Sequence, residues 1–252
     1  MRIEAPQPSH IPALRALWQE AFGDDDRFLD DFFRLAFSPR RSRCVLEYGQ
    51  PVAALYWFDE ICRDKPMAYL YGVATRQDYR NHGLCRGLIA DTHRQLTADG
   101  YAGLLLRPAT PALARAYTAM GYQSVIPASR IVCEAGDFGV ALRRISGEEY
   151  LRLRNRLLPQ GSVILPEKYL QFLQTQADFY CGTDFLLAVT VEGNTLTGAE
   201  LLGNSAAAPG ILTAFGVQRG TFLTPGRDGD YAMYCCLDGQ TPPPDYFGLA
   251  FE

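Results

Sequence analysis

The distribution of apolar and polar residues is most regular between Met67 and Tyr122. Apolar and aromatic runs without a helical stripe favour buried strands, and leucines at helical spacing favour amphipathic helices. Gly100 and Gly121 are placed to end two helices, and Thr110 with Pro111 is placed to begin one, as N-cap and first helical residue. The predicted elements are a strand at 67–75, a helix from 84 to 100, a strand at 101–106 and a helix from 110 to 121.

The segments around this stretch complete a mixed α/β domain. Three acidic residues in succession begin one helix, where the helix dipole favours negative charge. We expect the aromatic residues of that helix to pack in the core, or to line a substrate site. The further predicted elements are a strand at 1–5, helices at 9–23 and 24–37, a hairpin of 44–48 and 52–62, and a strand at 123–134.

The second half of the chain repeats this order of elements in a reduced form. A boundary near Ala135-Gly136-Asp137 gives two domains, 1–135 and 136–252. No apolar helix is expected after the predicted strand 210–217, so the second domain is expected to lack the helix that completes an anion site. Its predicted elements are a strand at 138–145, helices at 146–158 and 166–177, a hairpin of 185–191 and 195–202, and strands at 210–217, 231–237 and 246–251.

The loop between the strand 67–75 and the following helix is a candidate anion site. A strand that turns through a glycine into a helix leaves the first backbone N–H groups of that helix without intrahelical acceptors. Gly83 allows a ligand to approach the backbone, and Arg80 and Arg86 add positive charge on either side. An ordinary strand-to-helix turn has the same appearance when only one arginine and one glycine are considered.

Two sequence matches in the correct order make the assignment of this loop as an anion site more specific. The loop reads Arg80-x-x-Gly83-x-Cys85, and the next helix reads Ala112-x-x-x-Ala116-Tyr117-x-x-x-Gly121-Tyr122. Both resemble motifs of the GCN5-related N-acetyltransferases (GNAT), although Cys85 stands where that family usually has Gly or Ala. The resemblance implies an α/β fold with a mixed twisted sheet. The second half resembles a degenerate GNAT-like domain, and the tandem layout is similar to that of enhanced-intracellular-survival-type acetyltransferases.

The resemblance also implies a reaction and a site. Acetyl-CoA would be the acyl donor, a primary amine would attack it directly, and Tyr117 would be the general acid. A tyrosine that only packs in the core is the alternative for Tyr117. The residues implied in cofactor binding are Val73, Ala74, Thr75, Arg80, Asn81, His82, Gly83, Leu84, Cys85 and Arg86.

The sequence leaves the identity of the general base open. Many members of the family carry a glutamate on the strand that corresponds to 67–75, where this chain has Tyr69 and Tyr71. Asp59 and Glu60, at the end of the preceding strand, are candidates, although they also suit a solvated strand end. The other candidates for the base are a water chain and the C-terminal carboxylate at Glu252. A C-terminal carboxylate as base would resemble the survival-type enzymes.

Composition and charge limit the classes of partner that the chain is expected to bind. The chain of 252 residues is 48% hydrophobic and carries a net charge of −4, which gives no electrostatic case for nucleic acid. No apolar run is long enough for a membrane helix, and the seven cysteines and three histidines show no metal-ligand spacing, so we expect a cytoplasmic protein without a metal. Residues 136–252 carry 8 basic and 13 acidic side chains, which suits a cationic small-molecule or protein amine as acceptor. A non-catalytic acyl-CoA sensor or an interaction protein is the alternative, and either a monomer or a homodimer is compatible.

Overall fold

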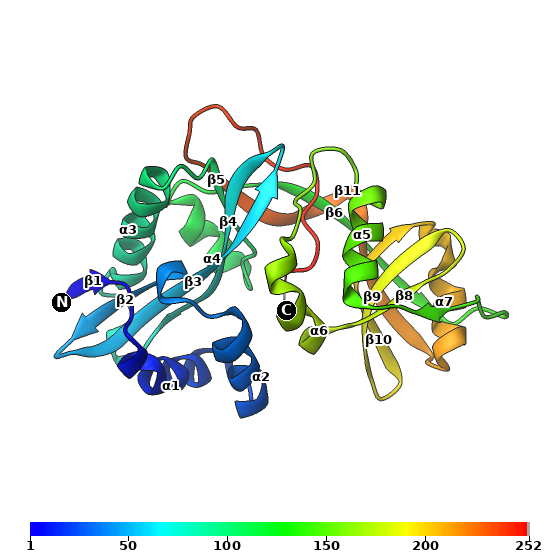
Figure 1. Cartoon of the computed structure of the whole chain (residues 1–252), viewed down its shortest axis with the longest axis horizontal. Coiled ribbons are helices and arrows are strands. Elements are labelled where there is room, and N and C mark those ends of the chain that lie inside the picture. The colour runs from blue at the N-terminus through cyan, green and yellow to red at the C-terminus, as the bar shows by residue number, and fades with distance from the viewer. Residues whose placement is uncertain (251–252) are drawn as a thin grey trace. The chain divides into compact units, whose positions relative to one another are not determined.

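The computed structural model describes residues 1–250, and most of its helices and strands are labelled in Figure 1. The chain divides into two compact units. The first contains Met1–Ser124 together with Met233–Pro243, and the second contains Val125–Ala232 together with the chain from Pro244 onward. The return of residues 233–243 to the first unit was not expected from the order of elements in the sequence.

The first unit contains a mixed sheet. Neighbouring strands are antiparallel except β4 and β5, which are parallel. The turn between β2 and β3 has positive φ at Tyr48 and Gly49, 48° and 77°, which matches the twist of a tight hairpin. The strands, in their order across the sheet, are β1 (Arg2–Glu4), β2 (Ser42–Glu47), β3 (Gln50–Cys62), β4 (Lys65–Thr75), β5 (Gly103–Leu106) and the last residues of β11 (Arg219–Cys236).

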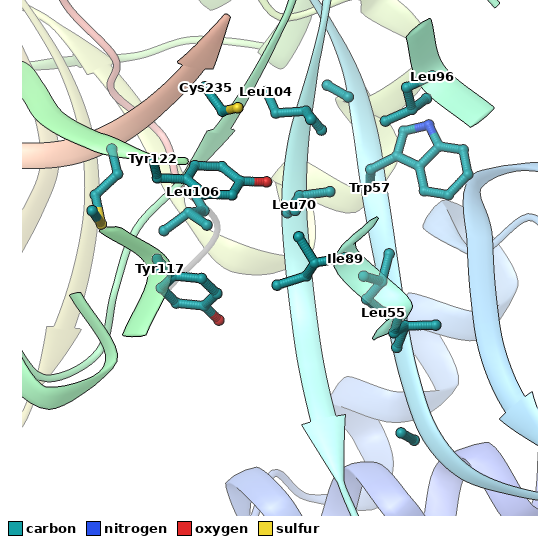
Figure 2. Packing of buried hydrophobic residues seen from close by; sticks show 14 of the residues in the cluster. Leu55, Trp57, Leu70, Ile89, Leu96, Leu104, Leu106, Tyr117, Tyr122 and Cys235 are labelled. Carbon is teal, nitrogen blue, oxygen red and sulfur yellow. The ribbon is translucent and has the colours of Figure 1, made fainter. Parts of the chain in front are cut away.

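Helices cover both faces of this sheet. Trp18 of α1 packs on Tyr56 and Tyr71, which lie opposite each other on β3 and β4. The other face holds the apolar core, in which Leu55 and Trp57 of β3 meet the leucines and isoleucine of α3 (Figure 2). The helices of this unit are α1 (Ile11–Phe22), α2 (Asp26–Asp31) with a π-helical turn at Phe32–Ala36, α3 (Leu84–Ala98) and α4 (Pro111–Thr118).

The second unit is also built on a mixed sheet. Its strands β10 and β11 are parallel and are connected through α7, whereas β7, β8, β9 and β10 are antiparallel neighbours. The remaining strand, β6, pairs with β11. The elements are β6 (Gln123–Glu134), β7 (Arg143–Arg144), α5 (Gly147–Leu157), α6 (Leu170–Gln176), β8 (Asp178–Cys181), β9 (Phe185–Glu192), β10 (Thr195–Gly203) and α7 (Ala208–Phe215).

The structure corrects three predicted strands of this unit. Residues 210–215 of the predicted strand 210–217 belong to helix α7, because Pro209 lies in its first turn and Gly216 ends it in the left-handed region at φ 69°. The segment 138–145 contains only the short strand β7, and Tyr246 forms an isolated bridge with Ser162. Helix α7 lies at the crossover between the parallel strands, so the expectation that a helix is missing there was wrong.

Beyond the residues of β10 that pair with β11, the space beside β10 is occupied by other residues of the second unit. Glu200 is fully buried, and its carboxylate pairs with Arg154 at 2.7 Å and accepts a hydrogen bond from Tyr150 at 2.6 Å. Gly248 packs so closely that a Cβ there would lie 2.1 Å from Glu200 Oε1. The second unit therefore has no room for a ligand beside Glu200.

Candidate active site

The parallel strands β4 and β5 part within the first unit. They pair at residues 67–69 and 103–105, and β4 then continues to Thr75 while β5 ends at Leu106. Among residues 1–250, no strand pairs with this edge of β4 beyond residue 69. Val73, Ala74 and Thr75 lie in this part of β4, although the Thr75 carbonyl already accepts a hydrogen bond from Arg80 Nε at 3.2 Å.

A glycine in β4 bends the strand at this point. The register between β3 and β4 shifts between Ala54 and Tyr56, and Gly72 adopts a φ of +56°. A Cβ on Gly72 would lie 2.5 Å from Trp18 Cζ3, so only glycine allows the Trp18 ring to pack here. Gly72 was not among the residues predicted from the sequence, although an isolated glycine inside a strand pattern is a signal for a bulge.

The loop after β4 ends at the N-terminus of α3. Gly83 is the N-cap with φ 76°, and a Cβ on it would meet nothing within 4 Å. The first intrahelical bond runs from Gly87 N to Gly83 O at 3.0 Å, and no acceptor within the described chain pairs with the N–H groups of Leu84, Cys85 and Arg86. Three open amides at the positive end of a helix of 15 residues are an arrangement that favours anion binding.

The charged residues of this loop are placed differently from one another. Arg80 bonds the Thr75 carbonyl and so holds the loop to the end of β4. Arg86 is exposed in the first turn of α3, where its guanidinium adds positive charge. Asn81 and His82 are also exposed, and Asn81 has a positive φ of 65°. Backbone amides rather than a ring of side chains therefore dominate the site.

Tyr117 lies in the apolar core of the first unit, against which Leu84 and Cys85 of α3 also pack. Its side chain is 7% exposed, and its ring packs edge-on against Tyr122 at a centroid distance of 5.9 Å (Figure 2). Burial raises the pKa of Tyr117, and the neighbouring thiol of Cys85 raises it further. Within residues 1–250 its hydroxyl makes no hydrogen bond to another residue. The structure thus brings Tyr117 and Cys85, from the two matched motifs, close together.

His93 gives this region a pH-dependent stability. Its Nε2 lies 2.8 Å from the hydroxyl of the fully buried Tyr122, and burial lowers the pKa of His93 below its ordinary 6.5. The unfolded chain therefore binds a proton at a higher pH than the folded chain. We expect a stabilising contribution that is present above pH 6.5 and is lost as pH falls below it. Urea unfolding at several pH values should show a smaller acid slope for His93→Gln, and an unchanged slope would contradict this assignment.

The two acidic candidates for the base lie on opposite faces of β3. Asp59 shares the α3 face with Trp57 and accepts a hydrogen bond from Tyr101 at 2.6 Å. Glu60 is 2% exposed and lies on the other face. Both are opposite the paired part of β4, at residues 68 and 67. The C-terminal carboxylate of Glu252 lies outside the described residues.

Aromatic rings cover the face that Glu60 shares. The Trp18 ring lies 4.6 Å from Phe32, 5.3 Å from Tyr56 and 5.6 Å from Tyr71, measured between centroids. Trp18 Nε1 donates a hydrogen bond of 2.7 Å to Asp24. Burial raises the pKa of Tyr71, and the charge of Asp24 raises it further. Trp18 and Asp24 were not singled out as site residues, because their meeting with β4 depends on tertiary packing.

Parted parallel strands beside an open helix N-terminus are the arrangement expected of a GNAT fold. Residues 2–125 match the model of the acetyltransferase (GNAT) domain. The chain therefore carries the domain of an acyltransferase enzyme. No curated protein sequence matches the chain.

Solved structures extend the similarity in fold over nearly the whole chain. A GCN5-related N-acetyltransferase from Kribbella flavida is similar with a TM-score of 0.70 and 17% identity, over 94% of this chain and 71% of that one. Eis1 from Mycobacterium abscessus is similar with a TM-score of 0.67 and 12% identity, over 95% and 75%. A GCN5-related N-acetyltransferase from Anabaena variabilis ATCC 29413 has a TM-score of 0.72 and 15% identity, over 94% and 72%.

In the described part of the chain, no helix combines the length and apolar character needed to cross a bilayer. No three histidine, cysteine or acidic side chains among residues 1–250 gather closely enough to hold a metal ion.

Proposed function

We propose that the protein transfers an acetyl group from acetyl-CoA to a primary amine by direct attack, with Tyr117 as the general acid. One observation carries the proposal: the open amides of Leu84, Cys85 and Arg86 lie at the end of the loop that leaves the unpaired stretch of β4. The open amides fit a diphosphate, and the free strand edge fits the extended pantetheine arm. When bound, acetyl-CoA supplies an acyl group that is activated as a thioester.

The chain's own residues have separate tasks in this proposal. The amides of the first turn of α3 would hold the diphosphate, and the backbone of Val73–Thr75 would align the arm. Tyr117 is protonated at neutral pH, as an ordinary tyrosine is, and burial raises its pKa further, so its hydroxyl is available as a proton donor. Of the two acidic candidates, Glu60 shares the aromatic face whereas Asp59 faces α3, which makes Glu60 the better candidate for the base.

The acceptor is proposed to be a cationic, partly apolar amine. The aromatic face around Trp18 and Tyr71 offers ring surfaces that attract a cation. Asp24 is half-buried, and within residues 1–250 only its Oδ2 accepts a hydrogen bond, from Trp18. Its Oδ1 can therefore pair with an ammonium group. Neutral amines lack that pairing and are expected to be poorer acceptors.

Two calorimetric titrations test the cofactor site. In Gly83→Asp, a carboxylate at the N-terminus of α3 competes with the diphosphate for the open amides, and aspartate tolerates the left-handed backbone. We expect acetyl-CoA affinity to fall by about 100-fold, because charge-assisted hydrogen bonds are lost. Gly100→Asp is the matched control, since Gly100 also has a positive φ, 82°, and open space, but follows the C-terminus of the same helix.

The expected affinity of Gly100→Asp is close to that of the unmodified protein. Equal affinity of both variants would place the diphosphate elsewhere. An amine panel monitored for CoA release then separates the alternatives, because binding without release by any acceptor identifies a sensor. A chain that binds no acetyl-CoA would leave only an interaction protein.

A further inference from the structure

Strand β6 has one open edge. It is 12 residues long and pairs with β11, and no other strand of residues 1–250 pairs with it. Pro127 lies within the strand, which is typical of an edge because proline donates no backbone hydrogen bond. The open edge presents unpaired N–H and C=O groups, and such an edge is a template for pairing with another strand.

The side chains of the last part of β6 alternate in a regular way. Ile131 and Cys133 pack against the apolar core of the second unit. Arg130, Val132 and Glu134 point to the opposite face and are exposed, with 75% of Val132 in solvent. Along the strand, the exposed face therefore carries a basic, an apolar and an acidic side chain in succession.

This pattern is complementary to itself. In an antiparallel pair of two β6 strands with Val132 opposite Val132 of the partner subunit, residues whose numbers are equally far from 132 face each other. Arg130 then faces Glu134 of the partner subunit, and Glu134 faces Arg130 of the partner subunit. From this charge complementarity we infer that the chain forms a two-fold symmetric dimer through the open edge of β6.

The charged groups are available for this pairing. Within the described residues Arg130 forms no ion pair. Glu134 lies 3.4 Å from Arg219, but both side chains are about three-quarters exposed, so solvent screens that pair. A shift of one residue in the register would put Glu134 of the partner subunit and Arg130 on opposite faces of the two-stranded sheet. Charge complementarity therefore favours the register in which the two Val132 residues face each other.

Sedimentation velocity of the full chain, over a range of protein concentrations, tests the dimer. Arg130→Glu and Glu134→Arg each place like charges opposite one another at two symmetric positions. We expect each single variant to weaken the dimer by about tenfold or more, and the double variant R130E/E134R to restore it. A monomer at all concentrations, or a dimer of unchanged affinity in the single variants, would overturn the inference.

A disulfide supplies a second readout that does not depend on charge. In a Cys236→Ser background, which removes the exposed thiol, Val132→Cys should form a covalent dimer on mild oxidation. Val191→Cys, on the exposed surface of β9, is the matched control. Faster crosslinking of Val132→Cys is the expected result, and equal rates would overturn the inference. Neither measurement depends on the proposed acetyl transfer.

Discussion

Replacing Tyr117 by phenylalanine is expected to lower kcat by about 10²–10⁴-fold, the range that a positioned general acid contributes. The substitution removes one oxygen from a side chain that is 7% exposed and forms no hydrogen bond within residues 1–250. The fold and the open amides of α3 should therefore be preserved, and acetyl-CoA affinity should stay within about twofold. Steady-state kinetics with the best amine, together with calorimetric titration of acetyl-CoA, measures both quantities.

Tyr122→Phe is the control for this experiment. Tyr122 lies beside Tyr117 in the same core and differs in that its hydroxyl is hydrogen-bonded to His93 at 2.8 Å. Losing that bond should lower the free energy of unfolding by about 1 kcal/mol with little change in kcat. If Tyr117→Phe retained full turnover, Tyr117 would be a core residue and the proton donor would have to be another group.

Glu200→Ala is expected to lower the free energy of unfolding of the second unit by about 3–5 kcal/mol. Glu200 and Arg154 are buried to 0% and 1% exposure of their side chains, and two charge-assisted hydrogen bonds of 2.7 and 3.0 Å join them. Removing the carboxylate leaves a guanidinium in the core without its counter-charge. Its remaining bond, to the Val163 carbonyl at 3.1 Å, does not compensate that charge.

Urea unfolding followed by circular dichroism measures this loss. Glu192→Ala, at the exposed end of β9, is the control and should change stability by no more than about 0.5 kcal/mol. Replacing both partners, as Arg154→Met with Glu200→Leu, should recover most of the stability, because two apolar side chains leave no buried charge. A loss below about 1 kcal/mol in Glu200→Ala would mean that Arg154 reaches solvent in the variant.

Local signals predicted much of the first unit. Thr110 accepts a hydrogen bond from Leu113 N at 3.2 Å and Pro111 lies in the first turn of α4, as expected from the pair of residues alone. Cap and turn residues act within a few positions of the chain, so their effect is readable without the fold. The same holds for the left-handed Gly83 before α3.

Short apolar runs were harder to interpret. The segment 210–217 is apolar except for Thr213, and such a run suits a buried strand or a buried helix equally well. Pro209 and Gly216 are the signals of helix ends that would have identified α7. The adjacent carboxylates at 59 and 60 are a comparable case, since strand alternation puts them on opposite faces but only tertiary packing decides which face meets α3 and which meets the aromatic rings.

The sequence by itself determined most local elements of the first unit, the glycine loop before α3 and the order of the two motifs, because these depend on backbone preferences and on spacing along the chain. Only the tertiary structure decided that residues 233–236 pair with β5, that Trp18 packs on Gly72, and that Glu200 is buried with Arg154. Those contacts join residues far apart in the chain. They form only where the burial of apolar surface offsets the entropy of closing long loops, and no local pattern records that balance.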